Sequence, residues 1–548
     1  MHGALGQSVH SFHCSVQIAD AAVSSRLFRG PTAWKQVQRR KAKAISAFST
    51  KALKHSSRQQ RCQATLQLDQ EATSKHRSEG AQAAPSSSDS SASYSWTKQW
   101  YPVSIVEDLE TYKPNAIKLL GKSLVLWKDT DNEWRCFDDV CPHRLVPLSE
   151  GRIETDGTLQ CAYHGWRFNA QGTCTTVPQA EDIDQNQKAA GHPRACVASY
   201  PVQVQHHLLW VWADASPNAQ LECLAKQPAV IDELQEGDKV IYMHPWFMRD
   251  MPFGVDILLE NVLDPSHVPF SHHGVIGNRD KVLPQSMHVL EPAEAESGFV
   301  VGVEAIKNGT NRTQLGTGKM TKIFFQPPTL VKYKFGGPGM QMITYCTPTS
   351  PGRSRLFYCL VADKEKAPKA MKRAMALRPK WLLFLNHFQR NNVLDGDTVF
   401  LHGQDCYMHQ AGSSQKYYMP TTMDKGIVSL RKWLGSLAGP IPWGTPATPD
   451  IWAKEYTRDD ILSRYNQHTQ HCKHCSKALK IITLLQRAAV AATSVSALLA
   501  AVAFGAGHSS LSFWAAVGVS AVAAAFAAYR LAQTRQKFIF VDYIQADH

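Results

Sequence analysis

Acidic residues are nearly missing from the start of the chain. Residues 1–65 contain eleven lysines and arginines but one acid, Asp20, so they contribute +10 to a formal net charge of +13 over 548 residues. A serine- and arginine-rich segment without acids is typical of an organelle transit peptide. A basic nucleic-acid-binding tail is the alternative, but the rest of the chain sums to only +3 and contains no nucleic-acid-binding motif. We therefore expect a transit peptide at 1–65, a serine-rich linker at 66–95 and no nucleic-acid partner.

Charged residues are missing near the end of the chain, where residues 488–529 contain no Asp, Glu, Lys or Arg. A single helix over these 42 residues would be about 60 Å long, roughly twice the hydrocarbon thickness of a bilayer. The sequence GAGHSS at 505–510 interrupts it. The pattern predicts two transmembrane helices within 481–530 with basic flanks on one side, followed by a tail at 531–548. A soluble or peripheral helical hairpin is the alternative, because alanine is only mildly apolar.

The thirteen cysteines lack the spacing of a small secreted disulfide protein. Two of them stand in mixed pairs, Cys141-x-His143 and Cys161-x-x-His164. Structural zinc sites usually pair like ligands, whereas a Rieske cluster binds two thiolates on one iron and two imidazoles on the other. The four residues therefore predict a Rieske 2Fe-2S cluster, with zinc as the alternative. The alternating pattern of KSLVLWKDTDNEWRCFDDVC predicts a hairpin turning at DTDN, which places the ligands in a small β domain.

A second motif, LLENVLDPSHVPFSHHG at 258–274, contains Asn261, Asp264, His267 and His272. Two histidines and one carboxylate form the facial triad of non-haem iron oxygenases, which leaves positions open for dioxygen. The prolines inside the motif prevent a regular helix, on which residues five apart would diverge. We predict that His267 and His272 bind a mononuclear iron, with a histidine-rich loop as the alternative.

The third ligand must be a carboxylate far along the chain. The segment VLDGDTVFLHGQ at 393–404 resembles a segment of Rieske oxygenases in which an Asp precedes a Gln by seven positions, and Asp397 has that spacing from Gln404. The resemblance therefore implies Asp397 as the ligand, with Asp395 and Asp405 as the alternatives.

A Cys-x-x-Cys pair, Cys472 and Cys475, precedes the apolar segment in HTQHCKHCSKAL. Neighbouring Lys473 and histidines would favour a reactive thiolate, so we predict a redox-sensing dithiol with thioredoxin as a partner. A small metal site with His468, His471 and His474 and an inert pair are the alternatives.

These motifs resemble those of the chloroplast Rieske non-haem iron oxygenases. The cluster loops followed by HGW, the iron motif, LDGDTVFLHGQ, RYNQHTQHC and FIFVDYIQAD carry the resemblance, which extends over about residues 94–548. The family includes enzymes of chlorophyll metabolism, the translocon-associated Rieske protein and the protochlorophyllide-dependent translocon component.

The resemblance implies an α+β fold. It implies a Rieske β domain at 96–215, a helix-grip catalytic domain (an antiparallel sheet plus a long helix) at 216–465 and a CxxC segment at 466–480. By the same resemblance, Asp264 would bridge a cluster histidine of one subunit and an iron histidine of the next in a homotrimer, and Asn261 would lie close to the iron.

The function implied by the resemblance is oxygenation and opening of the pheophorbide a macrocycle, a tetrapyrrole, with electrons from ferredoxin and a mononuclear non-haem Fe(II). The location implied is the chloroplast inner envelope or thylakoid membrane, with the catalytic domains facing the stroma. One alternative is a paralogous oxygenase acting on chlorophyllide, protochlorophyllide or a phyllobilin. Another is a non-catalytic Rieske redox component of the envelope translocon.

Overall fold

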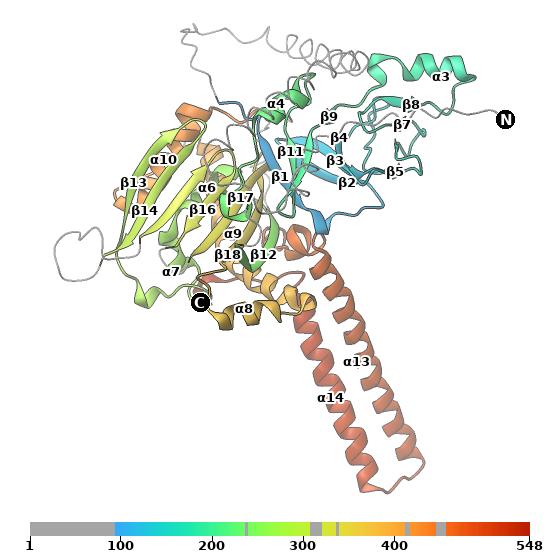
Figure 1. Ribbon diagram of the computed structural model, residues 1–548. Helices are drawn as coiled ribbons and strands as arrows, with labels where there is room; N and C mark the ends of the chain where they lie inside the picture. Colours follow the sequence, from blue (N-terminus) through green and yellow to red (C-terminus); the bar gives the residue numbers. More distant parts are fainter. Residues whose placement is uncertain are drawn as a thin grey trace.

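The computed structural model describes residues 94–235, 239–306, 320–335, 339–411, 417–444 and 456–547. The predicted transit peptide and residues 66–93 of the predicted linker lie outside these ranges. The described chain forms a β domain, a larger sheet-and-helix domain and a projecting pair of helices (Figure 1).

Three small antiparallel sheets build the first domain, in the strand orders β2-β3-β4-β9, β1-β11-β10 and β5-β6-β7-β8. Their bounds are β1 (Trp100–Ile105), β2 (Asn115–Leu119), β3 (Lys122–Lys128), β4 (Trp134–Asp138), β5 (Arg152–Ile153), β6 (Leu159–Gln160), β7 (Arg167–Phe168), β8 (Cys174–Thr176), β9 (Ser199–Tyr200), β10 (Val202–Gln205) and β11 (Leu208–Trp212). The predicted hairpin is present as β3 and β4, and Asn132 takes a left-handed φ of 62° in its turn. The third sheet is the smallest and carries the predicted cluster loops.

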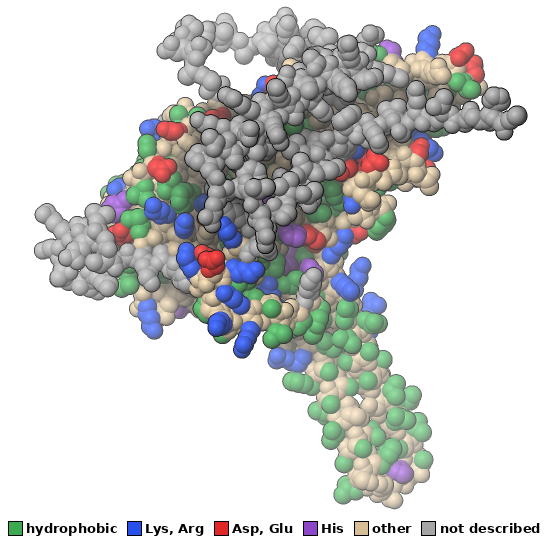
Figure 2. Space-filling model, viewed as in Figure 1, with side chains coloured by type: hydrophobic (Ala, Val, Ile, Leu, Met, Phe, Trp, Pro, Cys, Tyr) green, Lys and Arg blue, Asp and Glu red, His purple; other side chains and the backbone are tan. Residues whose placement is uncertain are grey.

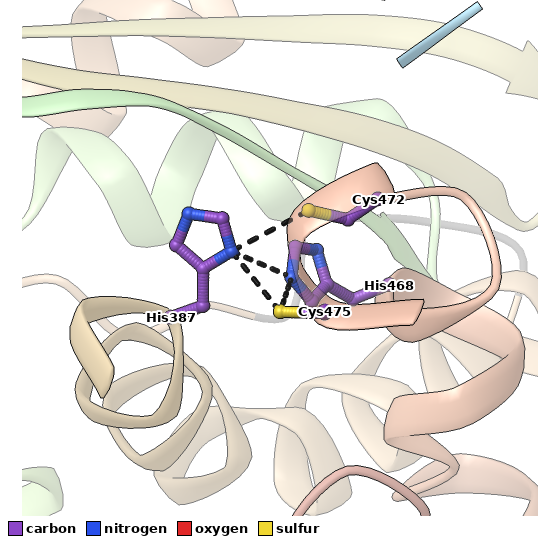
Figure 3. Close-up of side chains that lie close together, drawn as sticks. All are labelled: His387, His468, Cys472 and Cys475. Carbon is purple, nitrogen blue, oxygen red and sulfur yellow. Dashed lines mark hydrogen bonds between the residues drawn. The ribbon is translucent and has the colours of Figure 1, made fainter. Parts of the chain in front are cut away.

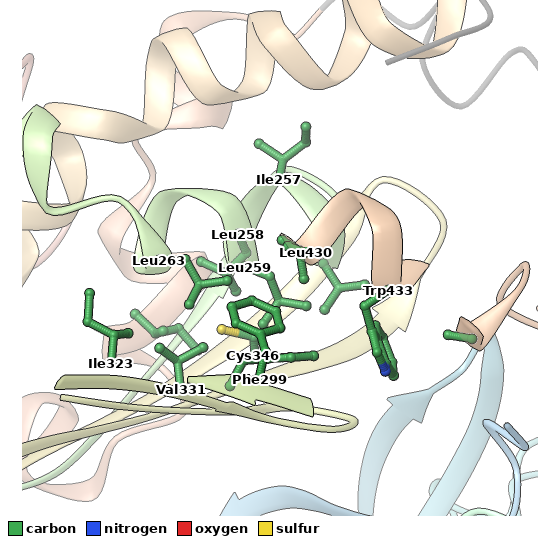
Figure 4. Packing of buried hydrophobic residues seen from close by; sticks show 14 of the residues in the cluster. Ile257, Leu258, Leu259, Leu263, Phe299, Ile323, Val331, Cys346, Leu430 and Trp433 are labelled. Carbon is green, nitrogen blue, oxygen red and sulfur yellow. The ribbon is translucent and has the colours of Figure 1, made fainter. Parts of the chain in front are cut away.

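The second domain is a seven-stranded antiparallel sheet in the order β12-β18-β17-β16-β15-β14-β13. Its strands are β12 (Val240–Met251), β13 (Gln285–Glu294), β14 (Gly298–Ala305), β15 (Thr321–Gln326), β16 (Leu330–Lys334), β17 (Met340–Ser350) and β18 (Arg353–Asp363). Helices α6 (Val255–Leu263) and α10 (Lys425–Lys432) lie over the sheet, and their apolar side chains meet those of the strands in one buried core (Figure 4). This sheet and the long helix α9 (Leu383–Ala411) confirm the predicted α+β catalytic fold.

Helix α9 extends without proline over 29 residues. Along one stripe it buries several polar side chains, at spacings of three, four or seven residues that return to the same helix face. The buried polar residues of this stripe are His387, Asn391, Asp395, Thr398 and Asp405. The stripe faces a buried ionic network, in which Asp395 lies 2.6 Å from both Arg249 and Arg464.

The chain ends in the two predicted apolar helices, α13 (Lys473–Gly505) and α14 (Leu511–Gln536). The most apolar 18-residue stretch of each helix has a mean hydropathy of 1.9, and none of that stretch is buried. They lie side by side and project from the body, with apolar surfaces along their length and Lys and Arg side chains gathered around their root (Figures 1 and 2). A helix of 26 residues is about 39 Å long, enough to span a bilayer.

Candidate metal centres

The two predicted cluster loops have the same backbone geometry. In the first, the Cys141 N–H donates to the carbonyl of Val146 at 2.8 Å, and Leu145 N–H donates to the carbonyl of Cys141 at 2.9 Å. In the second, the Cys161 N–H donates to the carbonyl of Trp166 at 2.8 Å, and the Gly165 N–H donates to the carbonyl of Cys161 at 3.1 Å. The fourth residue after each cysteine has a left-handed φ, 59° at Leu145 and 73° at Gly165. The two loops thus share one backbone turn, although the histidine follows the cysteine by two residues in the first loop and by three in the second.

The four predicted cluster ligands converge at the loop tips. Cys141 and Cys161 are buried, with 1% and 2% of their surfaces exposed, while the histidines lie further out, with ring centroids 4.5 Å apart. His143 stacks on Trp166 at 4.7 Å. Lost hydration and the nearby His164 and Arg144 lower the pKa of His143, which favours the neutral imidazole that binds metal. The buried Nδ1 of His143 has no hydrogen-bond partner among the described residues.

The second predicted motif begins within α6 and continues past its end. Asp264 precedes a proline and is extended, with ψ of 100°, because proline disfavours the helical region for the residue before it. A short turn, Pro265–His267, and the short helix α7 (Val268–Ser271) follow. This broken path places the rings of His267 and His272 5.2 Å apart, which a straight helix would not do. His273 turns away, and its Nδ1 accepts from Arg279 N–H at 3.1 Å.

Asp397 reaches the same point from α9. Its Oδ2 lies 3.3 Å from Nε2 of His272 and 3.8 Å from Nε2 of His267. These three donors lie within 4.8 Å of one another. His272 and Asp397 are buried, at 2% exposure each, and Nδ1 of the first and Oδ1 of the second have no hydrogen-bond partner in the described part of the chain.

The other two candidate carboxylates are engaged elsewhere. Asp395 lies two residues before Asp397, about 200° around the helix, and pairs with the two buried arginines. Asp405 accepts the N–H of Gly254 at 3.1 Å and lies 3.3 Å from His409. The structure therefore brings Asp397, and neither alternative, to the two histidines.

Asp264 lies on the outer side of the histidine pair. Its Oδ2 is 3.7 Å from Nδ1 of His267, and 29% of its side chain is exposed. Burial alone would raise the pKa of Asp264, but His267 and Ser266 outweigh it and the pKa is lowered. Burial would likewise lower the pKa of His267, yet Asp264 and Asp397 raise it. The negative charge around these histidines thus favours a bound cation, either a proton or a metal ion.

A buried polar network fixes α6 against α9 and α10. Glu260 accepts from Arg431 of α10, from the hydroxyl of Tyr417 at 3.0 Å and from Gln404 of α9 at 3.3 Å. Asn261, half-buried, is the next residue of α6. Gln404 thus connects α9, the helix that carries Asp397, to α6, the helix that leads into the histidine motif.

Two known protein families match separate parts of the chain. A family model described as Rieske [2Fe-2S] domain matches residues 99–201, and one described as Pheophorbide a oxygenase matches residues 325–415. The chloroplastic pheophorbide a oxygenase of Oryza sativa subsp. japonica is 32% identical over 84% of this chain and 87% of its own length. That of Arabidopsis thaliana is 31% identical over 83% of this chain and 84% of its own.

The chain belongs to the pheophorbide a oxygenase family. Flavonoid 8-hydroxylase 2 of Ocimum basilicum, also chloroplastic, is 32% identical over 69% of this chain and 72% of its own length, so a relative named for another substrate is nearly as similar. The predicted class of enzyme, a Rieske non-haem iron oxygenase, is confirmed.

Both predicted cofactors of this pheophorbide a oxygenase family member fit the residues present. Two buried thiols with two outer imidazoles are the donor set of a Rieske 2Fe-2S cluster. Two imidazoles and one carboxylate, with unpartnered buried donor atoms, suit a mononuclear non-haem iron.

Two features of the iron site have no signal in the motif spacing. Gly396 lets α9 approach the histidine loop, since a Cβ there would lie 2.8 Å from the carbonyl oxygen of Ser271 and 3.2 Å from Nδ1 of His272. The tail after α14 returns to the same place, where Gln545 donates to the carbonyls of Ser271 and Gly396 and Tyr543 is buried. The tail segment FIFVDYIQAD contributes to the family resemblance, but only the fold shows what it contacts.

The Cys-x-x-Cys pair is also buried, with 2% of Cys472 and 1% of Cys475 exposed. Of the histidines in the predicted alternative metal site, His468 lies beside them, whereas His471 is half-buried and His474 is exposed. His387 of α9, which the sequence did not indicate, completes the group.

Proposed function

We propose that this protein is a ferredoxin-dependent oxygenase that opens the macrocycle of pheophorbide a in chlorophyll breakdown. The observation that carries the proposal is the convergence of His267, His272 and Asp397 in a chain that also has a Rieske domain and is 32% identical to a named pheophorbide a oxygenase over most of its length. A redox carrier or translocon component without catalysis would not need this second group of ligands.

Each residue group has a separate task in this proposal. When bound, the cluster supplies single electrons and the mononuclear iron supplies dioxygen activation. His267, His272 and Asp397 would hold the iron, and Oδ2 of Asp264 lies 3.7 Å from Nδ1 of His267. A small approach of the two groups would form a charge-assisted hydrogen bond, which would fix the tautomer of His267 and leave its Nε2 for the metal.

The partners follow from exposed features. Leu145 and Tyr163, 74% and 59% exposed, lie on the two cluster loops, where Tyr163 packs against His164 at 3.9 Å, and they would form a docking rim. We assign this rim to ferredoxin or to the next subunit of a homotrimer, in which Asp264 with its half-buried carboxylate would face a neighbouring cluster. Asn261 would lie close to the iron, as the resemblance implies.

The helix pair α13 and α14 would anchor the enzyme in the plastid inner envelope or thylakoid membrane, with the catalytic domains in the stroma. This location suits a flat apolar pigment that partitions into lipid. The thioredoxin-sensitive role of Cys472 and Cys475 stays a prediction.

The test is product analysis with the purified full chain, reduced ferredoxin and dioxygen. Pheophorbide a, chlorophyllide a, protochlorophyllide and a flavone are offered separately, and products are identified by mass. We expect a ring-opened product with incorporated oxygen from pheophorbide a only. Chlorophyllide a carries an axial ligand on magnesium, and leaving that polar ligand without a partner in an apolar pocket costs about 1–3 kcal/mol, roughly tenfold to hundredfold discrimination. Peripheral hydroxylation of another pigment or of the flavone would replace this function with a paralogous one.

A further inference from the structure

Four buried side chains meet where the membrane helices join the catalytic domain. His387 comes from α9, His468 from the π-helical turn Tyr465–Thr469, Cys472 from the N-cap of α13 and Cys475 from its first turn (Figure 3). Their exposed fractions are 6%, 1%, 2% and 1%. Their donor atoms all lie within 4.8 Å of one another, and none belongs to the cluster or the iron site. We propose that these four residues bind one structural zinc ion.

The distances between the donor atoms match a single tetrahedral ion. Zn–N bonds of about 2.0–2.1 Å and Zn–S bonds of about 2.3 Å place two nitrogens about 3.4 Å apart and a nitrogen and a sulfur about 3.6 Å apart. Nδ1 of His387 is 3.1 Å from Nε2 of His468, 3.3 Å from Sγ of Cys475 and 3.6 Å from Sγ of Cys472. Nε2 of His468 is 3.3 Å from Sγ of Cys475. Two imidazoles and two thiolates in tetrahedral geometry are a donor set that zinc prefers.

A backbone group fixes the tautomer that metal binding needs. Nδ1 of His468 donates to the carbonyl of Met248 on β12 at 2.6 Å. The proton on Nδ1 leaves the lone pair on Nε2, the atom that points into the group. Histidines that bind metals usually donate their other ring nitrogen to such an acceptor. Phe247 stacks on the same ring at 4.5 Å and helps to exclude water.

The burial of the two cysteine sulfurs favours a structural role over a redox role. The sulfurs are both free and have almost no exposed surface for a partner protein to attack. Thiol–disulfide exchange needs such access, whereas structural zinc does not.

The ion would join α9, the turn Tyr465–Thr469 and the start of α13. Just beside the group, Lys473 N–H donates to Asp108 of the Rieske domain at 2.8 Å. His387 lies on the helix that carries Asp397, and the cysteines begin the first membrane helix. Zinc therefore would fix the direction in which α13 leaves the catalytic domain, and with it the position of the iron site relative to the membrane.

The test is the metal content of the full chain, purified in detergent with its iron sites filled. We expect one zinc per chain in addition to iron. His387→Ala and Cys475→Ser should lower zinc by at least about tenfold, since losing even a residue that only supports a metal ligand costs 10–100-fold in affinity. His471→Ala, in the same segment but outside the group, is the matched control and should keep its zinc. The paramagnetic signal of the Rieske cluster shows that each variant is folded.

The wild-type measurement decides the proposal even if the variants do not fold. Wild-type protein with full iron but no zinc, after expression with added zinc, overturns it. A Cys472–Cys475 disulfide that thioredoxin reduces would also overturn it, in favour of the redox role. Neither result depends on which pigment the enzyme oxidises, so the proposed function is tested separately.

Discussion

Gly396 on α9 allows a direct test of how the iron site is assembled. An alanine Cβ at this position would meet the Ser271 carbonyl oxygen at 2.8 Å and Nδ1 of His272 at 3.2 Å. The first of these atoms belongs to the backbone and cannot rotate away. We therefore expect Gly396→Ala to push the histidine loop away from Asp397 by several tenths of an ångström.

Two effects of this substitution oppose each other. Alanine stabilises a helix interior by about 1 kcal/mol relative to glycine, whereas overpacking costs about 1–3 kcal/mol. Because the clash involves the loop next to His272, we expect the cost to appear as loss of mononuclear iron more than as loss of folding. The iron of the Rieske cluster should be unaffected.

Gly403→Ala is the matched control on the same helix. Gly403 is exposed, and nothing lies within 4 Å of the position of its added Cβ. This variant should gain up to about 1 kcal/mol in stability and keep its iron. The assay is iron per chain together with the Rieske signal and turnover. If Gly396→Ala keeps its full iron and normal turnover, the close approach of α9 is not needed for the site.

Three further predictions concern the ligands and the anchor. Asp264→Asn should keep both metal centres but slow electron transfer from cluster to iron, measured by single-turnover kinetics; a normal rate would refute the inter-subunit route. Asp397→Ala should lose the mononuclear iron with little change in melting temperature. Asp395→Asn should instead destabilise the protein by about 3–5 kcal/mol, because it leaves two buried arginines without their carboxylate. If Asp395→Asn loses the iron and Asp397→Ala loses stability, Asp395 is the iron ligand. Replacing residues 488–529 with a short linker should release the protein from membranes with both iron sites intact, and extraction of the full chain by alkaline carbonate would contradict the transmembrane assignment.

The spacing of residues in the sequence was sufficient to predict those metal ligands that lie close together in one loop. The Cys-x-His and Cys-x-x-His pairs fix their own turns, and two histidines around a proline-broken segment are brought together without distant help. Asp397 was a harder choice, because three aspartates stand within eleven positions. Its spacing from Gln404 favoured it, but the physical reason appears only once α9 is known to be a helix, which turns Asp395 toward the buried arginines and Asp397 toward the histidines.

The rest depended on contacts between residues far apart in the chain. His387 lies 81 positions before His468, and no pattern in the sequence connects them. Helix α9 has weak amphipathic periodicity, because its buried face carries histidine, asparagine and aspartate as well as apolar residues. Gly396 allows α9 to approach the histidine loop closely, and Gln545 donates to backbone carbonyls. Neither effect requires a residue pattern that can be recognised in the sequence.

In the proposed function, both iron centres of this chain act on one tetrapyrrole. The most direct measurement is a single turnover of protein whose cluster has been reduced in advance, mixed with dioxygen and pheophorbide a. We expect the Rieske signal to decay only when the pigment is present, in step with formation of an oxygenated, ring-opened product, and His272→Ala to abolish both changes. Cluster oxidation that is independent of the pigment, with no oxygenated product, would contradict the claim.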